Sequence, residues 1–338
     1  MHMSDALVSP AVGGVMWAAT SGLTALAARR LERADDDRRV PLMGVLGAFV
    51  FAAQMVNFAI PGTGSSGHLG GGLLLAILLG PGAAFLAMAS VLAVQALFFA
   101  DGGLLALGCN VFNLGFFTCF VAYPLLYRPL AGARPGPGRL VLASTVAAVA
   151  GLLLGALGVV AETSLSGIST LSPGTFAALM LPVHLVIGLV EGLVTAAVVL
   201  AVRRARPEVL APASAPARNL RPLVLGLAAA AALLGTAGAW FASTRPDGLE
   251  WSVARASGGQ PAAAPESRLH ALLARVQRAT ALLPDYGFPG RAAAPAPAWP
   301  APSAGASLSG LVGGLVVLSC STAAGLGLRA LRRRRASR

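Results

Sequence analysis

The sequence contains no lysine and very little charge of either sign. Its 25 basic residues are all arginine, and charged residues make up only 11% of the 338 residues, against 56% hydrophobic ones. A soluble domain carries about 25% charged residues, so this composition excludes an ordinary soluble protein and indicates a membrane protein. The net charge of +12 would suit a nucleic-acid-binding protein. However, the arginines cluster between long apolar runs, as in the loops of membrane proteins, and we expect no nucleic-acid partner.

Cysteine is scarce as well, and several familiar catalytic motifs are missing. Cys109, Cys119 and Cys320 lie inside apolar segments at no metal-ligand spacing, so we expect small core residues and no disulfide or metal role. No GxxxxGK[ST] loop for ATP and no HExxH motif of a metalloprotease occurs. These absences argue against an intramembrane metalloprotease and indicate that the chain itself hydrolyses no ATP.

Long apolar runs predict an all-α polytopic membrane protein. A spanning helix needs about 20 apolar residues. The stretch 68–100 is too long for one helix and short for two, and Pro81 predicts a turn inside it. Nine spans are expected, near residues 10–28, 41–60, 68–80, 82–100, 103–127, 140–161, 175–202, 221–242 and 307–328.

The arginine clusters predict how these spans are oriented. With an outside N-terminus, the clusters at 29–39, 127–139, 203–208 and 328–338 all fall on one side, which the positive-inside rule places in the cytoplasm. We therefore expect a multi-pass protein of the cell (inner) membrane with its C-terminus in the cytoplasm. The first ten residues lack the basic region of a signal peptide, so we expect residue 1 to be retained.

A Pro/Ala/Arg-rich stretch divides the chain into two blocks. We expect a seven-helix bundle over 1–204, a cytoplasmic linker over 205–220, and a two-helix hairpin over 221–338 with spans near 221–242 and 307–328. The hairpin encloses an extracytoplasmic insert. Within it, residues 266–283 place apolar side chains at three- and four-residue spacing, which predicts an amphipathic helix.

The first two residues, Met1 and His2, form a chelating unit. The α-amine, the deprotonated His2 backbone nitrogen and His2 Nδ1 close a five-membered and a six-membered ring around one metal ion. A fourth nitrogen completes a square-planar set, which favours Ni(II) or Cu(II) over Zn(II), Mg(II) and Ca(II). Binding displaces protons, so affinity should fall as the pH drops.

The expected fourth donor is His68, which closes a Gly/Ser-rich stretch on the same predicted side of the membrane as residue 1. A histidine at position 2 often has no chemical role, and a lone histidine at a helix start is often a cap or an interface residue. The two histidines on one side of the membrane favour the metal site, because polar groups at a membrane edge are commonly functional.

The segments MHMSDALVSP and FVFAAQMVNFAIPGTGSSGHLGGGLL (49–74) resemble the substrate-specific membrane subunits of nickel and cobalt energy-coupling factor transporters, the CbiM/NikM family. LGCNVFNLG (107–115) and PVHLVIGLVEGLVTAAV (182–198) are also similar to the family, whereas Ala59-Ile60 stands where a proline is common. RPDGLEWSVA (245–254), LLPDYGFPG (282–290) and SLSGLVGGLVVL (307–318) resemble its small accessory component, the CbiN or PDGLE type, here fused in one chain.

The resemblance implies an S component that takes nickel or cobalt from outside and docks on a transmembrane coupling subunit carrying two ATPase subunits. It assigns the metal to Met1, His2 and His68, with the N-terminus folded back into the bundle. The metal is the transported ligand, and no cofactor is expected. The square-planar set favours nickel, although low-spin Co(II) accepts a similar geometry.

Further polar and small residues have more than one interpretation. Two polar pairs are candidates for orienting His68 or closing the metal loop: Gln54 and Asn57, expected on one helix face, and Ser65 and Ser66 in the loop. For Gln54 and Asn57, plain hydrogen bonding between helices is an equally good interpretation. Asn110, with Asn113, is a candidate for the substrate loop beside a packing role. Ala48 and Ala52 form a small-xxx-small pair, for which the family implies docking on the coupling subunit.

Three alternatives complete the sequence-based hypotheses. His184 and Glu191 lie roughly 10 Å apart along one span, which favours interhelical anchoring over a proton relay. Asp247 and Glu250 either attract cations near the membrane surface or have a structural role in the Pro-Asp-Gly turn. For the whole chain, the alternative function is a stand-alone secondary nickel/cobalt permease or channel, although the HxxxxDH motif of the familiar secondary permeases is missing.

Overall fold

The computed structural model describes residues 2–33, 39–210, 219–259, 267–290 and 299–336, and almost all of its regular structure is helical. Within the described residues, six helices are long and apolar enough to cross a membrane. They are α1 (Pro10–Arg33), α4 (Pro81–Phe98), the continuous stretch of α5 (Leu107–Val111), the π-helical η2 (Phe112–Tyr127) and α6 (Arg128–Ala131), then α7 (Pro137–Ser166), α8 (Pro173–Ala205) and α12 (Ala304–Ala336). The predicted all-α polytopic membrane fold is confirmed.

Three further apolar helices are shorter than their predicted spans. They are α2 (Arg39–Gln54), α3 (Gly72–Leu79) and α9 (Arg221–Gly235). The eight residues of α3 rise about 12 Å, far less than the roughly 30 Å of a bilayer core. The predicted span 68–80 is therefore wrong as a full span: its first residues form a loop, and α3 turns into α4 at Gly80 and Pro81.

The predicted span 41–60 is also too long, because α2 ends at Gln54 and the chain then forms a hairpin. In that hairpin, β1 (Phe58–Ala59) pairs antiparallel with β2 (Ser66–Gly67). Gln54 and Asn57 therefore do not share a helix face, which corrects the prediction from their spacing. The apolar run continues through residue 60, and its composition alone does not reveal where the backbone leaves the helix.

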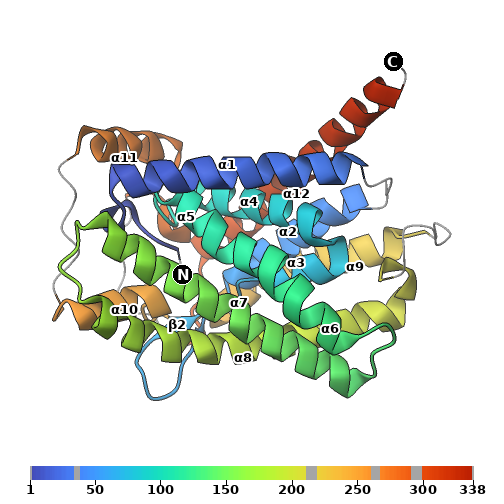
Figure 1. Cartoon of the computed structure of the whole chain (residues 1–338), viewed down its shortest axis with the longest axis horizontal. Coiled ribbons are helices and arrows are strands. Elements are labelled where there is room, and N and C mark those ends of the chain that lie inside the picture. The colour runs from blue at the N-terminus through green and yellow to red at the C-terminus, as the bar shows by residue number, and fades with distance from the viewer. Residues whose placement is uncertain (1, 34–38, 211–218, 260–266, 291–298, 337–338) are drawn as a thin grey trace.

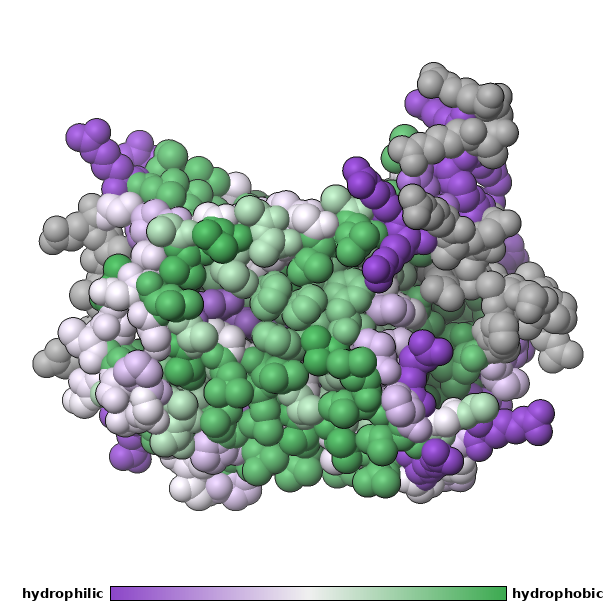
Figure 2. All heavy atoms as spheres, viewed as in Figure 1, coloured by the Kyte–Doolittle hydropathy of each residue, from purple (hydrophilic) through white to green (hydrophobic). Residues whose placement is uncertain are grey.

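The helices pack as one bundle, with α7 along α8 and α2 between α9 and α12 (Figure 1). Figure 1 places α10 (Gly248–Ala256) and α11 (Arg268–Thr280) at one end of the molecule and α9 with the C-terminal part of α12 toward the other. Hydrophobic residues cover most of the middle of the visible face, and hydrophilic ones gather toward the two ends (Figure 2). This distribution suits a bundle that crosses a bilayer along its long axis.

The second block is packed onto the first. α9 and α12 flank α2, α10 lies against α8, and α11 lies against α4. The short helices η3 (Pro207–Val209), η4 (Gly238–Phe241) and η5 (Pro284–Tyr286) connect these elements. α11 falls inside the predicted amphipathic stretch 266–283. Part of the predicted linker, residues 211–218, lies outside the described residues.

The cysteines differ from one another. Cys109 and Cys119 are buried free thiols, as expected, whereas Cys320 is exposed on α12. The expectation that Cys320 is a core residue is therefore wrong, because the face of α12 that carries it is not covered by the described residues.

Candidate metal centre at the N-terminus

The N-terminal segment ahead of α1 folds into the bundle. Met3 is fully buried, and the Asn110 side chain binds it twice: Asn110 Oδ1 accepts from the Met3 amide at 2.7 Å, and Asn110 Nδ2 donates to the Met3 carbonyl at 3.1 Å. The Gly103 amide donates to the same carbonyl at 2.9 Å. Two residues on, the Asp5 carboxylate accepts from the Ala106 amide at 3.0 Å, at the start of α5. These bonds fix the backbone that carries His2.

The structure brings His2 and His68 together. Their imidazole rings are stacked with centroids 5.1 Å apart and planes 9° from parallel. Both side chains are nearly inaccessible, since the His2 side chain is 6% and His68 is 9% exposed. Met1, the third predicted ligand residue, lies outside the described residues.

Few side chains near His2 and His68 could bind a metal ion. No group of three or more His, Cys, Asp or Glu residues suited to a metal ion occurs among the residues that the structure describes. The predicted site does not need such a group, because two of its four nitrogens belong to the backbone and the α-amine. Its two imidazoles are those of His2 and His68, which the structure places together.

The loop that carries His68 is braced by two buried side chains from different helices. The Glu191 carboxylate of α8 accepts from the amides of Gly70 and Gly71 at 2.7 and 3.0 Å, and Gln54 Nε2 at the end of α2 donates to the Gly70 carbonyl at 2.8 Å. Gly71 has φ +79°, and a Cβ there would lie 2.5 Å from Val50 Cγ1, so only glycine fits this turn. Glu191 thus anchors a loop, where interhelical anchoring was expected.

Burial sets the protonation state of the loop histidine. It lowers the pKa of His68 to about 3, and the electrostatic interaction with His2 acts in the same direction. The His68 imidazole is therefore neutral over the physiological range. Neutral imidazole is the form that binds a metal ion.

A carboxylate faces His2 from the loop after α4. Asp101 Oδ1 lies 3.2 Å from His2 Nδ1, and Asp101 Oδ2 accepts a hydrogen bond from the Tyr286 hydroxyl. Burial alone would raise the pKa of Asp101, but the charge and hydrogen bond of His2 and the Tyr286 hydroxyl hold it below its usual range. Asp101 is therefore an ionised neighbour of the first histidine.

The PDGLE-containing segment closes over the His68 hairpin. Ser66 Oγ donates to the carbonyls of Arg245 and Pro246 at 2.8 and 3.2 Å, and the Ser66 amide donates to the Pro246 carbonyl at 2.8 Å. Asp247 and Glu250 form a capping box at the start of α10. For these two acids the structural interpretation is confirmed, since each accepts from a backbone amide of the other residue.

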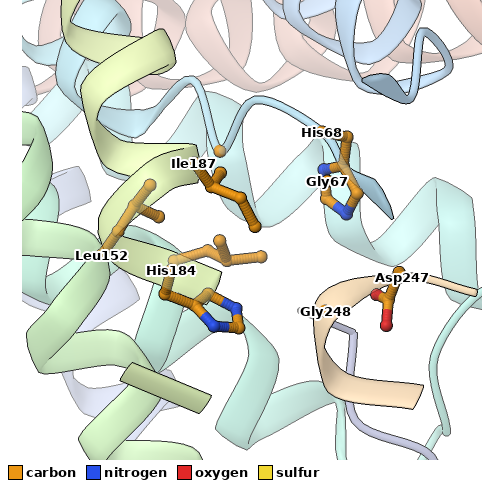
Figure 3. A pocket seen from close by; sticks show the side chains of 9 residues that line it. Gly67, His68, Leu152, His184, Ile187, Asp247 and Gly248 are labelled. Atoms are coloured by element: carbon orange, nitrogen blue, oxygen red, sulfur yellow. The ribbon is translucent and has the colours of Figure 1, made fainter. Parts of the chain in front are cut away.

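Figure 3 shows a small cavity at this junction, lined by His68 from the loop, His184 from α8 and Asp247 from the start of α10. Its volume of about 10 Å³ is that of a single water molecule. His184 Nδ1 lies 2.8 Å from the Met180 carbonyl of its own helix, so this hydrogen bond does not provide the interhelical anchoring expected of His184. A larger cavity of about 700 Å³ lies beside His2, between the two blocks, and its lining includes Asp101, Asp285 and Tyr286.

The rest of the insert holds the segments around His2. His270 Nε2 lies 2.9 Å from the Val8 carbonyl, and Gln277 Nε2 donates to the carbonyls of Ala96 and Gly102 at 2.9 and 2.7 Å. Gly102 has φ +83°, and a Cβ there would lie 2.9 Å from Asn110 Nδ2 and 3.4 Å from His2 Cβ. The backbone of this loop therefore lies directly against the His2 residue.

The remaining predicted residues have different surroundings. The Asn57 carbonyl accepts from the Ser243 amide at 2.8 Å, and Ser65 Oγ lies 2.7 Å from Thr63 Oγ1, so both stabilise the hairpin or its cover. Ala48 and Ala52 on α2 are 4% and 1% exposed. The roles predicted for these residues, and for Gln54, Ser66 and Asn110, stay predictions.

Asp101 and Tyr286 are the neighbours of the site that the sequence did not reveal. One signal was present: Asp101 is the sole acidic residue between Asp37 and Glu162, and it lies in a loop predicted to face outward. Its contact with His2, 99 positions away, depends on the tertiary fold.

Comparison with known sequences gives the class of protein. The family model CbiM, described as the cobalt uptake substrate-specific transmembrane region, matches residues 2–209, and the PDGLE domain model matches residues 221–330. The chain therefore belongs to the CbiM family, with a PDGLE domain following in the same polypeptide. The predicted resemblance to both components is confirmed.

Particular relatives share the fused arrangement. The chain is 35% identical over 359 aligned positions to the fused nickel transport protein NikMN of Rhodobacter capsulatus, covering 99% of each chain. It is 30% identical over 272 positions to the cobalt transport protein CbiM of Geobacter sulfurreducens, covering 75% of this chain and 76% of that one. A crystal structure of a truncated transition metal transporter superposes with a TM-score of 0.53 at 32% identity, covering 61% of this chain and 99% of the other.

Proposed function

We propose that the chain is the substrate-binding membrane component of an energy-coupling factor importer for a divalent transition metal, with nickel favoured and cobalt next. The observation that carries this proposal is the stacked pair of His2 and His68, held by a buried N-terminal segment. The relatives named for nickel and cobalt transport support the same class of cargo.

In this proposal the metal is bound by four nitrogens in one plane. The Met1 amine, the His2 amide nitrogen and His2 Nδ1 form the two chelate rings, and His68 supplies the fourth nitrogen. In this proposal His68 binds the metal through Nε2, because its Nδ1 lies 3.0 Å from the Leu69 carbonyl. Square-planar nitrogen coordination favours Ni(II), and low-spin Co(II) is the next candidate.

The partners in this proposal are a transmembrane coupling subunit and two ATPase subunits, with the N-terminus outside and the C-terminus in the cytoplasm. Docking at Ala48 and Ala52 on α2 requires a movement of neighbouring helices, because both alanines are buried in the present arrangement. In this proposal residues 1–204 form the metal-binding bundle, residues 205–220 form a cytoplasmic linker, and residues 221–338 form an accessory block that covers the metal loops.

The test compares variants of the full chain in cells that supply the coupling and ATPase subunits. His2→Ala, His68→Ala and a one-residue extension before Met1 should each abolish nickel and cobalt uptake while membrane insertion stays normal. A tag at the C-terminus is the matched control for the extension. His270→Gln, which keeps a donor for the Val8 carbonyl, is the control for the loss of a histidine. Normal uptake by the N-terminally extended chain refutes the binding mode, and uptake by the chain alone in liposomes supports a secondary permease instead.

A further inference from the structure

A cavity of about 930 Å³ lies where α6 joins α7, away from the histidine pair. Its walls include the C-terminal part of η2, α6 with the loop that follows it, and the end of α8 with η3. Figure 1 places α6 toward the end of the molecule opposite α10 and α11. The cavity shares no lining residue with the two cavities beside the histidines. Its size is that of pockets that bind small molecules, which measure about 300–1,000 Å³.

Three arginines and, among the described residues, no acidic ones line this cavity. They are Arg128 at the start of α6, Arg134 in the loop before α7, and Arg203 in the last turn of α8. Arg128 and Arg134 are exposed and have no ion pair within the described part of the chain. The carboxylate of Glu208 in η3 lies 4.0 Å from Arg206 instead. Because guanidinium groups stay charged at physiological pH, three of them without a carboxylate attract an anion.

The loop between α6 and α7 is fixed in place, so the cavity is formed without a ligand. Arg203 Nη1 donates to the Pro135 carbonyl, and Arg139 Nε donates to the Leu130 carbonyl. Gly132 has φ +70°, and a Cβ there would lie 3.1 Å from Arg139 Nη2. A left-handed glycine therefore ends α6 directly against the Arg139 guanidinium.

The remaining wall of the cavity is apolar and aromatic. It includes Ile77 near the end of α3, Leu140 in α7 and Leu210 after η3. The rings of Tyr123 and Tyr127 also line it, and they stack with centroids 5.8 Å apart and planes 18° from parallel. Tyrosine is enriched where a bilayer meets water, because its ring is apolar and its hydroxyl is polar. The cavity thus has the composition of a site at the membrane surface.

The apolar wall lies beside surface that faces the bilayer. Leu125 follows Pro124, which lines the cavity, and Leu142 lies on α7 close to Leu140. Leu125 and Leu142 are 65% and 57% exposed and belong to helices long enough to span a membrane. Figure 2 shows hydrophilic residues bordering the hydrophobic surface at this end of the molecule. A ligand in the cavity therefore has arginines on one side and acyl chains of the bilayer on the other.

We propose that this cavity binds an anionic phospholipid, with its phosphate at Arg128, Arg134 and Arg203 and its acyl chains along η2 and α7. Arginine suits a phosphate because its planar group forms two parallel hydrogen bonds. A zwitterionic lipid fits less well, because the three guanidinium groups repel its cationic headgroup. The site depends on the membrane fold and not on the metal centre. Only its assignment to the cytoplasmic leaflet, where anionic lipids attract basic segments, rests on the proposed orientation.

The test measures binding of dioleoylphosphatidylglycerol to the purified full chain by native mass spectrometry, with dioleoylphosphatidylcholine as the zwitterionic comparison. Arg128→Gln and Arg134→Gln each remove one charge and should raise the Kd for phosphatidylglycerol roughly fivefold, and the double variant should raise it roughly 25-fold. Arg128→Lys keeps the charge but loses the bidentate geometry, so its Kd should lie between those of the parent chain and Arg128→Gln. The nickel Kd should stay unchanged in all of these variants.

Arg204→Gln is the matched control, because Arg204 lies in the same last turn of α8, is exposed and does not line the cavity. It should keep the phosphatidylglycerol Kd of the parent chain. Equal weakening by Arg204→Gln and Arg128→Gln overturns the proposal, because diffuse positive charge then explains the binding. Equal affinity for phosphatidylcholine overturns it as well.

Two other occupants of the cavity are distinguished by the same variants. If inorganic phosphate binds to the lipid-free chain as tightly as phosphatidylglycerol does, the occupant is a soluble anion and the proposal is wrong. If Arg128→Gln and Arg134→Gln leave lipid binding unchanged but lose the coupling subunit on purification, the arginines contact an acidic surface of that protein, and the proposal is also wrong.

Discussion

Removing the Asn110 side chain should release the N-terminal segment and weaken metal binding strongly. Asn110→Ala deletes the two bonds to Met3 and leaves the buried Met3 amide without its acceptor, while the Met3 carbonyl keeps the Gly103 amide. The lost bond from Asn110 Nδ2 contributes about 1 kcal/mol, and the buried Met3 amide left unpaired costs about 1–3 kcal/mol. The total of about 2–4 kcal/mol corresponds to a roughly 30- to 800-fold shift away from the docked segment.

The apparent nickel Kd rises in proportion to the loss of docked protein, so the same factor is its upper limit. Asn110→Asp keeps the acceptor for the Met3 amide and loses the donor, so its effect should be intermediate. Thr24→Ala is the control, because the Thr24 hydroxyl donates to the Thr20 carbonyl within α1, away from Met3. Calorimetric titration of folded, monodisperse protein gives the three Kd values. A Kd for Asn110→Ala within twofold of the parent chain refutes the assigned role of this clamp.

Three further outcomes are expected. Glu191→Gln replaces one acceptor of the loop amides by a donor and should lower the free energy of unfolding by about 2 kcal/mol and weaken nickel binding; an unchanged melting temperature and Kd contradict this. Burial lowers the pKa of His68 to about 3 in the folded, metal-free chain, against about 6.5 in the unfolded chain. Between these two pH values, His68 is protonated in the unfolded chain and neutral in the folded one. Stability should therefore fall on acidification, by at most about 1.4 kcal/mol per pH unit for this group, and the slope should be smaller in His68→Gln; equal slopes exclude this contribution. Ser66→Ala removes the single hydroxyl donor that the Arg245 and Pro246 carbonyls share, at a cost of about 1 kcal/mol, and should speed proteolysis of the insert roughly fivefold. An unchanged rate would show that the backbone bond suffices.

The fold was predictable where the signal was local. Long apolar runs with few charges specify α7, α8 and α12, and the apolar spacing specifies α11. The end of α2 at Gln54 was not predictable in this way, because its apolar run continues into residues that pair as a hairpin. The short α3 was ambiguous for the same reason: an apolar loop ahead of a short helix has the composition of a longer span.

The metal centre was predictable where chelation chemistry is local to the sequence. His2 follows from the rings that an N-terminal Met-His unit can close, and His68 from its place in a Gly/Ser-rich loop. The surroundings depend on contacts over long sequence separations, as with Asp101 beside His2 and Glu191 beneath the His68 loop. Charged groups at such distances carry no periodic pattern, so only the folded structure reveals their partners.

X-ray absorption at the nickel edge, on the full chain loaded with one equivalent of Ni(II), tests the central claim most directly. The account predicts a four-coordinate, square-planar ion with nitrogen ligands only, and loss of this spectrum in both His2→Ala and His68→Ala. A six-coordinate spectrum with mainly oxygen ligands, or a square-planar spectrum that survives His68→Ala unchanged, would contradict it.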